Sequence, residues 1–154
     1  MRLVNFKGIR NLTITEFNEK GLEILGYHGV GKSTIRDAYH WALWNKNSSD
    51  RQNFNIKTLD KHNQPLHRLD HEVTVEFVSN TGVVTTFRRL FKEDWVKKQG
   101  ASVEVLEGHY SELFVNNVKC KAAEYQKYVE EIFPPQLGKL LTDPLYFNNE
   151  ISWE

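Results

Sequence analysis

The sequence has almost no cysteine, no net charge and no long hydrophobic run. Cys120 is the only cysteine in 154 residues, which excludes an internal disulfide and a cysteine-rich zinc site and is typical of a reducing compartment. Twenty basic and twenty acidic side chains cancel, so any contact with nucleic acid would depend on a local patch. No segment approaches the length of a membrane span, and the N-terminus lacks the apolar run of a signal peptide. We expect a cytoplasmic protein with no membrane contact.

Repeats, low-complexity tracts and linkers rich in proline or serine are also missing. Hydrophobic residues make up 40% and charged residues 26% of the chain, which is ordinary for a soluble globular protein. A chain of this length can bury a sizeable core without a disulfide or a metal. We therefore predict one domain over residues 1–154.

Alternating apolar and polar residues predict several antiparallel strands. In chain order these are residues 2–17, in two parts divided by Lys7-Gly8; 71–79 and 83–91, joined by a turn at Thr81-Gly82; 102–108; and 112–121, with a turn at Asn116-Asn117. A short apolar run, "LEIL" at residues 22–25, predicts one more strand. Residues 45–55 are predicted to be a polar loop.

Apolar residues at helical spacing predict two helices. The first runs from Lys32 to about Trp44, and the second covers "KAAEYQKYVEEIF" at 121–133 and ends at Pro134-Pro135. "QLGKLL" at 136–141 is predicted to be a further short helix. We interpret Trp41 and Trp44 as packing residues against the sheet rather than as a platform for adenine.

The most specific pattern lies between the predicted strand at 22–25 and the first helix. "GYHGVGKS" at 26–33 satisfies G-x-x-x-x-G-K-[ST], the pattern of a phosphate-binding loop. Its glycines, Gly26, Gly29 and Gly31, allow backbone N–H groups to converge on phosphates, and the helix N-terminus adds partial positive charge. The alternative is a glycine-rich turn with an accidental lysine. The predicted strand before the loop and helix after it favour the phosphate loop.

Two side chains of this loop are expected to hold the ligand directly. Lys32 would reach the β- and γ-phosphates of a nucleotide, and the Ser33 hydroxyl would hold Mg²⁺. We therefore expect ATP and Mg²⁺ as ligands.

The sequence lacks the second half of an ATPase site. Hydrolysis needs a further acidic group for the metal and a residue that orients the attacking water. A run of four apolar residues followed by Asp or Glu does not occur, because "VEVLEG" is interrupted by Glu104 and "LFVNN" ends in asparagines. We name no catalytic residue and expect the isolated chain to bind nucleotide rather than hydrolyse it.

The order of these motifs resembles the N-terminal head segment of the SMC/SbcC/RecF-type ATPases of chromosome structure and DNA repair. The resemblance is carried by "VNFKGIRNLTITEF", "GLEILGYHGVGKSTIRDAYHWAL" and "HEVTVEFVSNTGVVTTFRRLF". It extends over essentially the whole chain, which is also similar to small phage and bacterial "AAA family ATPase" proteins. It implies an α/β fold, namely a P-loop NTPase that forms the N-terminal lobe of an ABC-type ATPase head, with antiparallel β-hairpins and C-terminal short helices.

In such heads a coiled coil separates this lobe from a C-terminal part that carries the Walker B acids and an "LSGG"-type signature. The present sequence has neither the signature nor heptads, so it resembles the first half of a head. It is either a piece of a longer protein or a short protein that kept only the nucleotide-binding half.

The resemblance implies further site residues. Thr34 falls next to the α-phosphate, and Lys7 stands where the family often has an arginine near the nucleotide. Arg51 falls where SMC heads carry an arginine that touches nucleotide or DNA. "PLYFNNEISW" at 144–153 resembles the segment that holds the glutamine ligand of Mg²⁺, which makes Asn149 and Glu150 the candidates there.

The resulting hypothesis is an ATP-binding half of an SMC/SbcC-like head in DNA repair, recombination or phage DNA metabolism. Its partners would be a second copy, another ATPase head or a nuclease subunit. One alternative is a non-catalytic regulatory or inhibitory protein that binds a partner ATPase or nuclease complex. A small-molecule kinase would need lid arginines and an acceptor site, and the long antiparallel hairpins argue against it.

Two weaker patterns have simpler interpretations. Basic and aromatic residues alternate over 87–98, which could form a local basic patch on DNA, but we favour a strand with its aromatics in the core and its charges in solvent, because Glu93 and Asp94 interrupt the patch. His62, His67 and His71 lie close together in sequence. We do not expect a metal site there, since no cysteine joins them and the segment leads into a strand.

Overall fold

The structure is a computed structural model that describes residues 1–15 and 23–133. Its strands are β1 (Arg2–Phe6), β2 (Ile9–Thr13), β3 (His71–Val78), β4 (Val84–Val96), β5 (Val105–Val115) and β6 (Val118–Cys120), and its helices are α1 (Lys32–Trp44) and α2 (Ala122–Ile132). The predicted helix at 136–141 and the candidate metal ligand Glu150 lie outside the described residues. Neither helix in the described part is long and apolar enough to cross a membrane.

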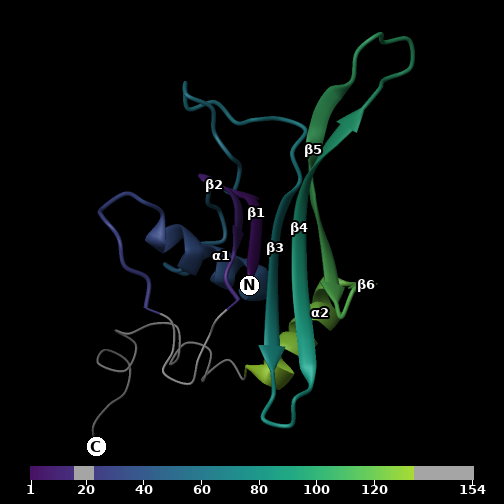
Figure 1. Ribbon diagram of the computed structural model, residues 1–154. Helices are drawn as coiled ribbons and strands as arrows, with labels where there is room; N and C mark the ends of the chain where they lie inside the picture. Colours follow the sequence, from purple (N-terminus) through teal and green to yellow (C-terminus); the bar gives the residue numbers. More distant parts are fainter. Residues whose placement is uncertain (16–22, 134–154) are drawn as a thin grey trace, which may run out of the picture.

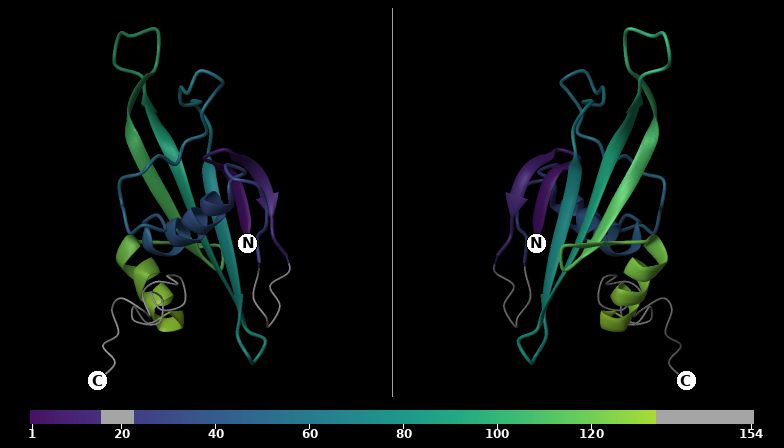
Figure 2. Two further views of the ribbon diagram at one scale, coloured as in Figure 1. Left: turned by 90° about the vertical axis from the view of Figure 1, so that its left-hand side faces the viewer. Right: turned by 90° about the vertical axis from the view of Figure 1, so that its right-hand side faces the viewer.

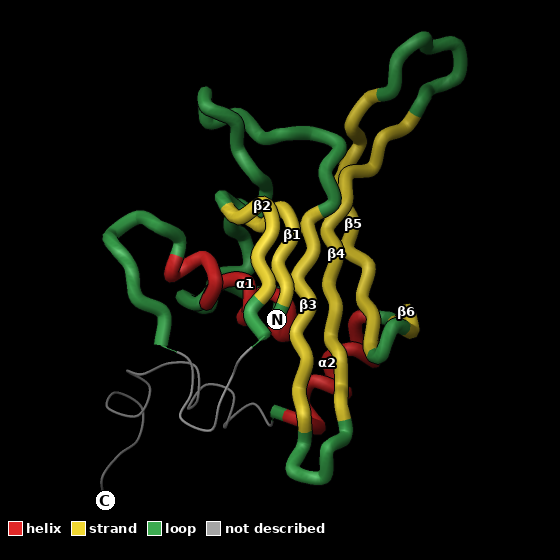
Figure 3. Tube along the Cα trace, in the orientation of Figure 1, coloured by secondary structure: helices red, strands yellow, loops and turns green. Residues whose placement is uncertain are grey.

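All the strands form one antiparallel sheet in the order β2-β1-β3-β4-β5-β6 (Figures 1 and 3). The predicted hairpins β1–β2 and β3–β4 are confirmed, with turns at Lys7-Gly8 and Thr81-Gly82. The pairing of β1 with β3, in which Leu3 lies opposite Val73, joins strands far apart in sequence. This pairing brings the N-terminal hairpin beside the central strands.

The predicted pair of strands at 102–108 and 112–121 is wrong. Residues 105–115 form one continuous strand, β5, which pairs along β4 in a long hairpin. The last residues of β4 extend past β3 and pair with β5 alone, so this end of the hairpin projects from the sheet (Figure 1). The turn at Asn116-Asn117 is confirmed, with φ angles of 49° and 64° that asparagine tolerates well.

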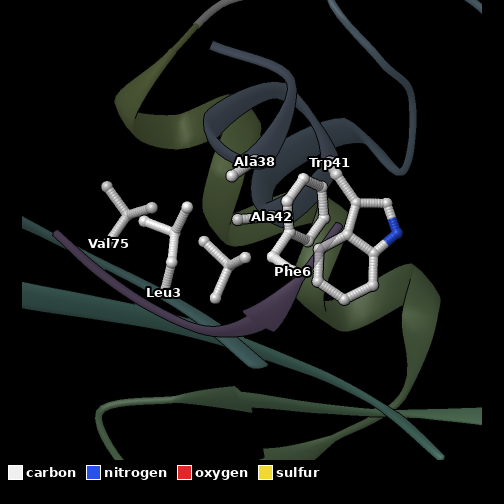
Figure 4. Close-up of a cluster of buried hydrophobic side chains, with 7 residues drawn as sticks. Leu3, Phe6, Ala38, Trp41, Ala42 and Val75 are labelled. Carbon is white, nitrogen blue, oxygen red and sulfur yellow. The ribbon is translucent and has the colours of Figure 1, made fainter. Parts of the chain in front are cut away.

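Both helices cover the same face of the sheet (Figure 2). The α1 helix packs against β1, β3 and β4, while α2 packs against β5 and the end of α1. Figure 4 shows side chains of α1 meeting those of β1 and β3 in the larger core cluster. The buried residues of this cluster are Leu3, Phe6, Ala38, Trp41, Ala42, Val73 and Val75.

A second cluster joins α2 to the sheet. Its buried residues are Leu43, Phe87, Leu113, Val115, Tyr125 and Val129. Trp41 belongs to the first cluster and Trp44 packs against the second, which confirms that both tryptophans are packing residues. The two clusters meet along α1, so this helix is fixed against the sheet over most of its length.

The strand predicted at residues 22–25 is not formed over its described residues. Residues 23–27 have no regular secondary structure, and the Leu25 side chain is 80% exposed. An apolar run becomes a strand only when a neighbouring strand supplies backbone partners and buries its side chains. No such neighbour is paired with these residues in the described part of the chain.

Candidate phosphate-binding site

The loop at residues 26–31 is an exposed turn that leads into α1 (Figure 1). Gly29 and Gly31 have φ angles of 85° and 94°, a region that residues with a Cβ rarely adopt. A Cβ added to Gly26 would lie 2.9 Å from Cγ2 of Val30, so this position also requires glycine in the present geometry. All three glycines of the motif therefore have a conformational or steric reason to be there.

The N-terminus of α1 is open to an anion. Gly31 is the N-cap, no side chain among residues 1–15 and 23–133 caps the helix, and the first turn contains no acidic residue. The first N–H groups of a helix have no partner within the helix, and its dipole places partial positive charge at this end. A phosphate group would satisfy both. The residues present thus fit the nucleotide that the sequence predicts.

Lys32 currently closes the loop on itself. Its ammonium donates to the backbone carbonyls of Gly26, at 2.6 Å, and Tyr27, at 2.7 Å. Ser33 is exposed in the first turn of the helix, and Thr34 follows it half-buried. The loop, Lys32 and Ser33 are therefore together at one accessible end of α1.

Lys7 reaches the same helix from the turn between β1 and β2. Its ammonium forms an ion pair with Oδ2 of Asp37 at 2.5 Å and lies 5.1 Å from the centre of the Phe54 ring. The other oxygen, Oδ1 of Asp37, accepts hydrogen bonds from the backbone N–H of Ser48, at 2.9 Å, and from its hydroxyl, at 2.6 Å. Burial raises the pKa of Asp37, but the bonds from Lys7 and Ser48 outweigh it and leave the pKa below its usual value.

Asp37 and Ser48 were not predicted from the sequence. The available signal was an acidic residue beside Ala38 and Trp41 on the buried side of a predicted helix, where a carboxylate needs a partner. The partner comes from a turn 30 residues away, which local patterns do not indicate.

Arg51 lies in the loop after α1, which is confirmed to be without helix or strand. The Asn47 side chain shapes this loop by accepting from the backbone N–H groups of Ser49, at 3.0 Å, and Arg51, at 2.9 Å. The loop is tied to α1 through Ser48 and Asp37, so Arg51 is only three residues from an anchor on this helix.

The basic stretch on β4 is largely paired. Arg88 lies near Glu72, and Lys92 lies between Asp70 and Glu112, all at ion-pair distances. Phe87 is buried, as predicted for the aromatic face. Lys97 and Lys98 are exposed at the projecting end of the hairpin.

The prediction that all the charges of this stretch lie in solvent is wrong for Arg89. This side chain is buried against the rings of Trp41 and Tyr125, and it donates to the Ala42 carbonyl and to the side-chain oxygen of Asn45, both at 3.2 Å. Its position on the inward face of β4 places it at the end of α1, where a cation is favoured.

The histidines near β3 have structural partners. His67 contacts Glu93 at 2.8 Å, and His71 is fully buried with its Nδ1 at the Asn5 carbonyl. Within residues 1–15 and 23–133, no group of three or more His, Cys, Asp or Glu side chains is arranged to hold a metal ion. Among the predicted metal ligands, the described residues include only Ser33.

Comparisons with known proteins identify the family of this chain. Residues 1–143 match the family described as AAA domain. No curated protein matches this chain. Five chains of solved structures match it. One of them comes from work on ATP-driven dimerization and DNA-stimulated activation of SMC ATPases, with 20% sequence identity, a TM-score of 0.60 and coverage of 86% of this chain and 78% of that chain.

At this identity the structural match establishes the fold alone. It confirms the mixed α/β class and the resemblance to the SMC-type ATPase head. The family match covers nearly the whole sequence. The chain belongs to the AAA domain family.

Proposed function

We propose that the chain binds ATP with Mg²⁺ at the loop formed by residues 26–33. The N–H groups at the start of α1 would hold the phosphates, with Lys32 exchanging its two carbonyl partners for phosphate oxygens. The Ser33 hydroxyl would hold the metal. Mg²⁺ would neutralise charge that develops on the phosphates.

The observation that carries this proposal is the open N-terminus of α1. Phosphate-binding sites need backbone N–H groups that no other part of the chain occupies, at a place that solvent ligands can reach. Here Gly31 provides no side-chain cap, the first turn has no acidic residue and residues 26–30 are exposed.

The broader role we propose is that of an ATP-binding half of an SMC-like head in DNA repair or recombination. The family match and the fold support an ATPase-head type of function. The matched SMC work concerns ATP-driven dimerization and DNA-stimulated activation. By analogy, nucleotide held at the loop would bring a second head, from another copy or another ATPase, against this end of α1.

Exposed apolar side chains beside the loop support pairing with a protein partner. Leu25, Tyr27 and Val30 are 80%, 90% and 61% exposed, and they cluster within six residues of one turn. Apolar side chains gathered next to a ligand site are typical of interaction surfaces. The paired state of Arg88 and Lys92 gives less support to DNA contact through β4.

Calorimetric titration of the wild type and Lys32→Ala with ATP and Mg²⁺ tests the proposal. We expect the wild type to bind and Lys32→Ala to bind at least about tenfold more weakly, because one charge-assisted contact to phosphate is lost. Lys127→Ala, which removes an exposed lysine of α2, is the matched control and should bind as the wild type does.

Equal affinities of the wild type and Lys32→Ala, or no binding by either, would contradict the proposal. The same preparations should release no phosphate above background, since no residue is assigned to orient the attacking water. Turnover near about 1 s⁻¹, in the ordinary enzyme range, would show that the chain contains an acid we have not assigned.

A further inference from the structure

The Asp37 carboxylate joins three separate segments at the phosphate-loop helix. It lies on α1, Lys7 comes from the β1–β2 turn, and Ser48 comes from the loop after the helix. Both carboxylate oxygens are used, one by Lys7 and the other by Ser48. The Asp37 side chain is 11% exposed and that of Lys7 28%, so most of the pair is shielded from solvent.

The turn that carries Lys7 is held in an unfavourable backbone conformation. Lys7 has a φ angle of 50° and Asn5 one of 51°, in the left-handed region. A residue with a Cβ rarely adopts such a conformation, because the Cβ crowds the backbone there. The neighbouring glycine, Gly8, could adopt a positive φ angle without strain, yet the residue that adopts it is Lys7.

Hydrogen bonds from other segments hold this turn in place. The backbone N–H of Lys7 donates to the carbonyl of Ile56 at 2.8 Å. The carbonyl of Asn5 accepts from the Thr58 hydroxyl at 3.0 Å and contacts the buried ring of His71. The ammonium of Lys7 therefore has a defined position rather than that of a free surface lysine.

That position is close to the candidate site. Asp37 follows Ser33 by four residues, which places the two side chains on the same face of α1, with Cβ atoms about 6 Å apart. A carboxylate so near the helix N-terminus would repel a triphosphate, but its pairing with Lys7 cancels that charge. The Lys7 ammonium is therefore bound to a residue that lies one helical turn after Ser33 on α1.

We propose that Asp37 is a positioning residue of the nucleotide site, which acts by holding the Lys7 ammonium beside the start of α1. This inference rests on the proposed function. Asp37 does not touch the ligand in this scheme. It sets where Lys7 and the loop that carries Arg51 lie relative to the phosphates.

Asp37→Asn tests the inference because the two possible roles of Asp37, a repelling charge or a positioning residue, predict opposite changes in ATP affinity. If Asp37 were only a negative charge near the phosphates, removing it would strengthen nucleotide binding. If it positions Lys7, the amide variant releases the ammonium and ATP affinity falls, by at least about fivefold in calorimetry at a temperature where the variant is folded. Asp94→Asn, an exposed carboxylate in the part of β4 that pairs only with β5, is the charge-matched control and should leave affinity unchanged.

A double-mutant cycle separates positioning from a general loss of structure. Lys7→Met keeps the aliphatic stem beside Phe54 but removes the charge. If Asp37 acts through Lys7, the double variant loses less affinity than the sum of the two single losses. Additive losses, or an Asp37→Asn variant that binds as well as or better than the wild type, overturn the inference.

Two further measurements keep the test decisive. Carboxyl NMR should find the pKa of Asp37 raised in Lys7→Met relative to the wild type, and an unchanged pKa would contradict the pair.

Ser48→Ala replaces Asp37→Asn if that variant does not fold. It removes one hydrogen bond to the same carboxylate and should weaken ATP binding about twofold or more. Equal affinity of Ser48→Ala and the wild type would overturn the inference. A wild type that binds no nucleotide overturns the proposed function and this inference together, whereas a binding wild type with unaffected variants overturns only the inference.

Discussion

The two ends of α1 differ in how their unpaired backbone groups are satisfied. At the C-terminal end, the carbonyl of Ala42 accepts from Arg89 at 3.2 Å and from the Tyr125 hydroxyl at 2.8 Å. Asn45 ends the helix with a φ angle of 58° and donates its N–H to the carbonyl of Trp41. At the N-terminal end, Gly31 precedes the helix, and no side chain in the described part of the chain caps it.

This difference separates a structural end of the helix from the end that we propose to bind the ligand. The buried end is satisfied by residues from β4 and α2, which fix it to the sheet, and the buried Arg89 adds a cation where the helix dipole is negative. The exposed end leaves its N–H groups to solvent or to an anion. A helix held at one end and open at the other is suited to present a binding site from a rigid support.

The largest effect on stability should come from the fixed part of α1. Trp41 is 1% exposed and packs on Phe6, with ring centres 5.4 Å apart. Trp41→Ala should lower the free energy of unfolding by about 3–5 kcal/mol, because it leaves a cavity in the core. Tyr27→Ala, at a 90% exposed position in the loop, should change it by less than about 0.5 kcal/mol. Urea unfolding measures both, and similar losses would contradict the contrast between the two regions.

A smaller loss in the free energy of unfolding, which depends on pH, is expected for Tyr125→Phe. Removing the hydroxyl that donates to Ala42 should cost about 1–2 kcal/mol at neutral pH. Burial raises the pKa of Tyr125 well above its ordinary value of 10.0, and that of Tyr39 to about 12. The unfolded chain therefore loses these protons first, and stability falls as the pH rises above about 10, by up to ~1.4 kcal/mol per pH unit for each tyrosine.

Tyr125→Phe should remove the contribution of one tyrosine to this loss of stability at alkaline pH. The free energy of unfolding measured between pH 8 and about pH 11 would thus fall less steeply in the variant than in the wild type. Parallel curves would mean that the hydroxyl of Tyr125 reaches solvent.

A smaller loss of stability than that of Trp41→Ala, together with an effect on binding, is expected for Gly31→Ala at the open end of the helix. Gly31→Ala places a Cβ at a φ angle of 94°, which should cost about 1 kcal/mol. Gly100→Ala, at 83° in the turn between β4 and β5, is the matched control and should cost about the same. Only Gly31→Ala should also weaken ATP binding. An equal effect of both variants on calorimetric affinity would argue against the loop as the binding site.

Much of the fold could be predicted from local patterns. The alternation of Val73, Val75 and Phe77, together with Thr81-Gly82, was enough for the β3–β4 hairpin, because a short turn forces neighbouring strands to pair. The glycine loop and the helix after it were likewise predicted by a pattern that is local in sequence. The predicted ligands ATP and Mg²⁺ follow from the same pattern and stay predictions.

The errors arose where distant segments decide the outcome. The run at 22–25 has the composition of a strand, yet its described residues are exposed, because no strand in the described part pairs with them. Residues 102–108 and 112–121 were predicted to be two strands, but the long partner β4 keeps residues 105–115 in one strand. Arg89 was predicted to be solvated, whereas the end of α1 offers it a buried carbonyl.

The sequence by itself determined the glycine-rich turn before α1, the helix that follows it and the hairpins β1–β2 and β3–β4, since each depends on residues close together in the chain. Only the tertiary structure decided that Lys7 meets Asp37, that Ser48 shares the same carboxylate, and that Arg89 and Tyr125 hold the far end of α1. These contacts join residues as far as 83 positions apart. Burial makes such partners necessary because a buried charge or carbonyl must be paired, but only the packing of the sheet against its helices selects which residue is near enough to pair.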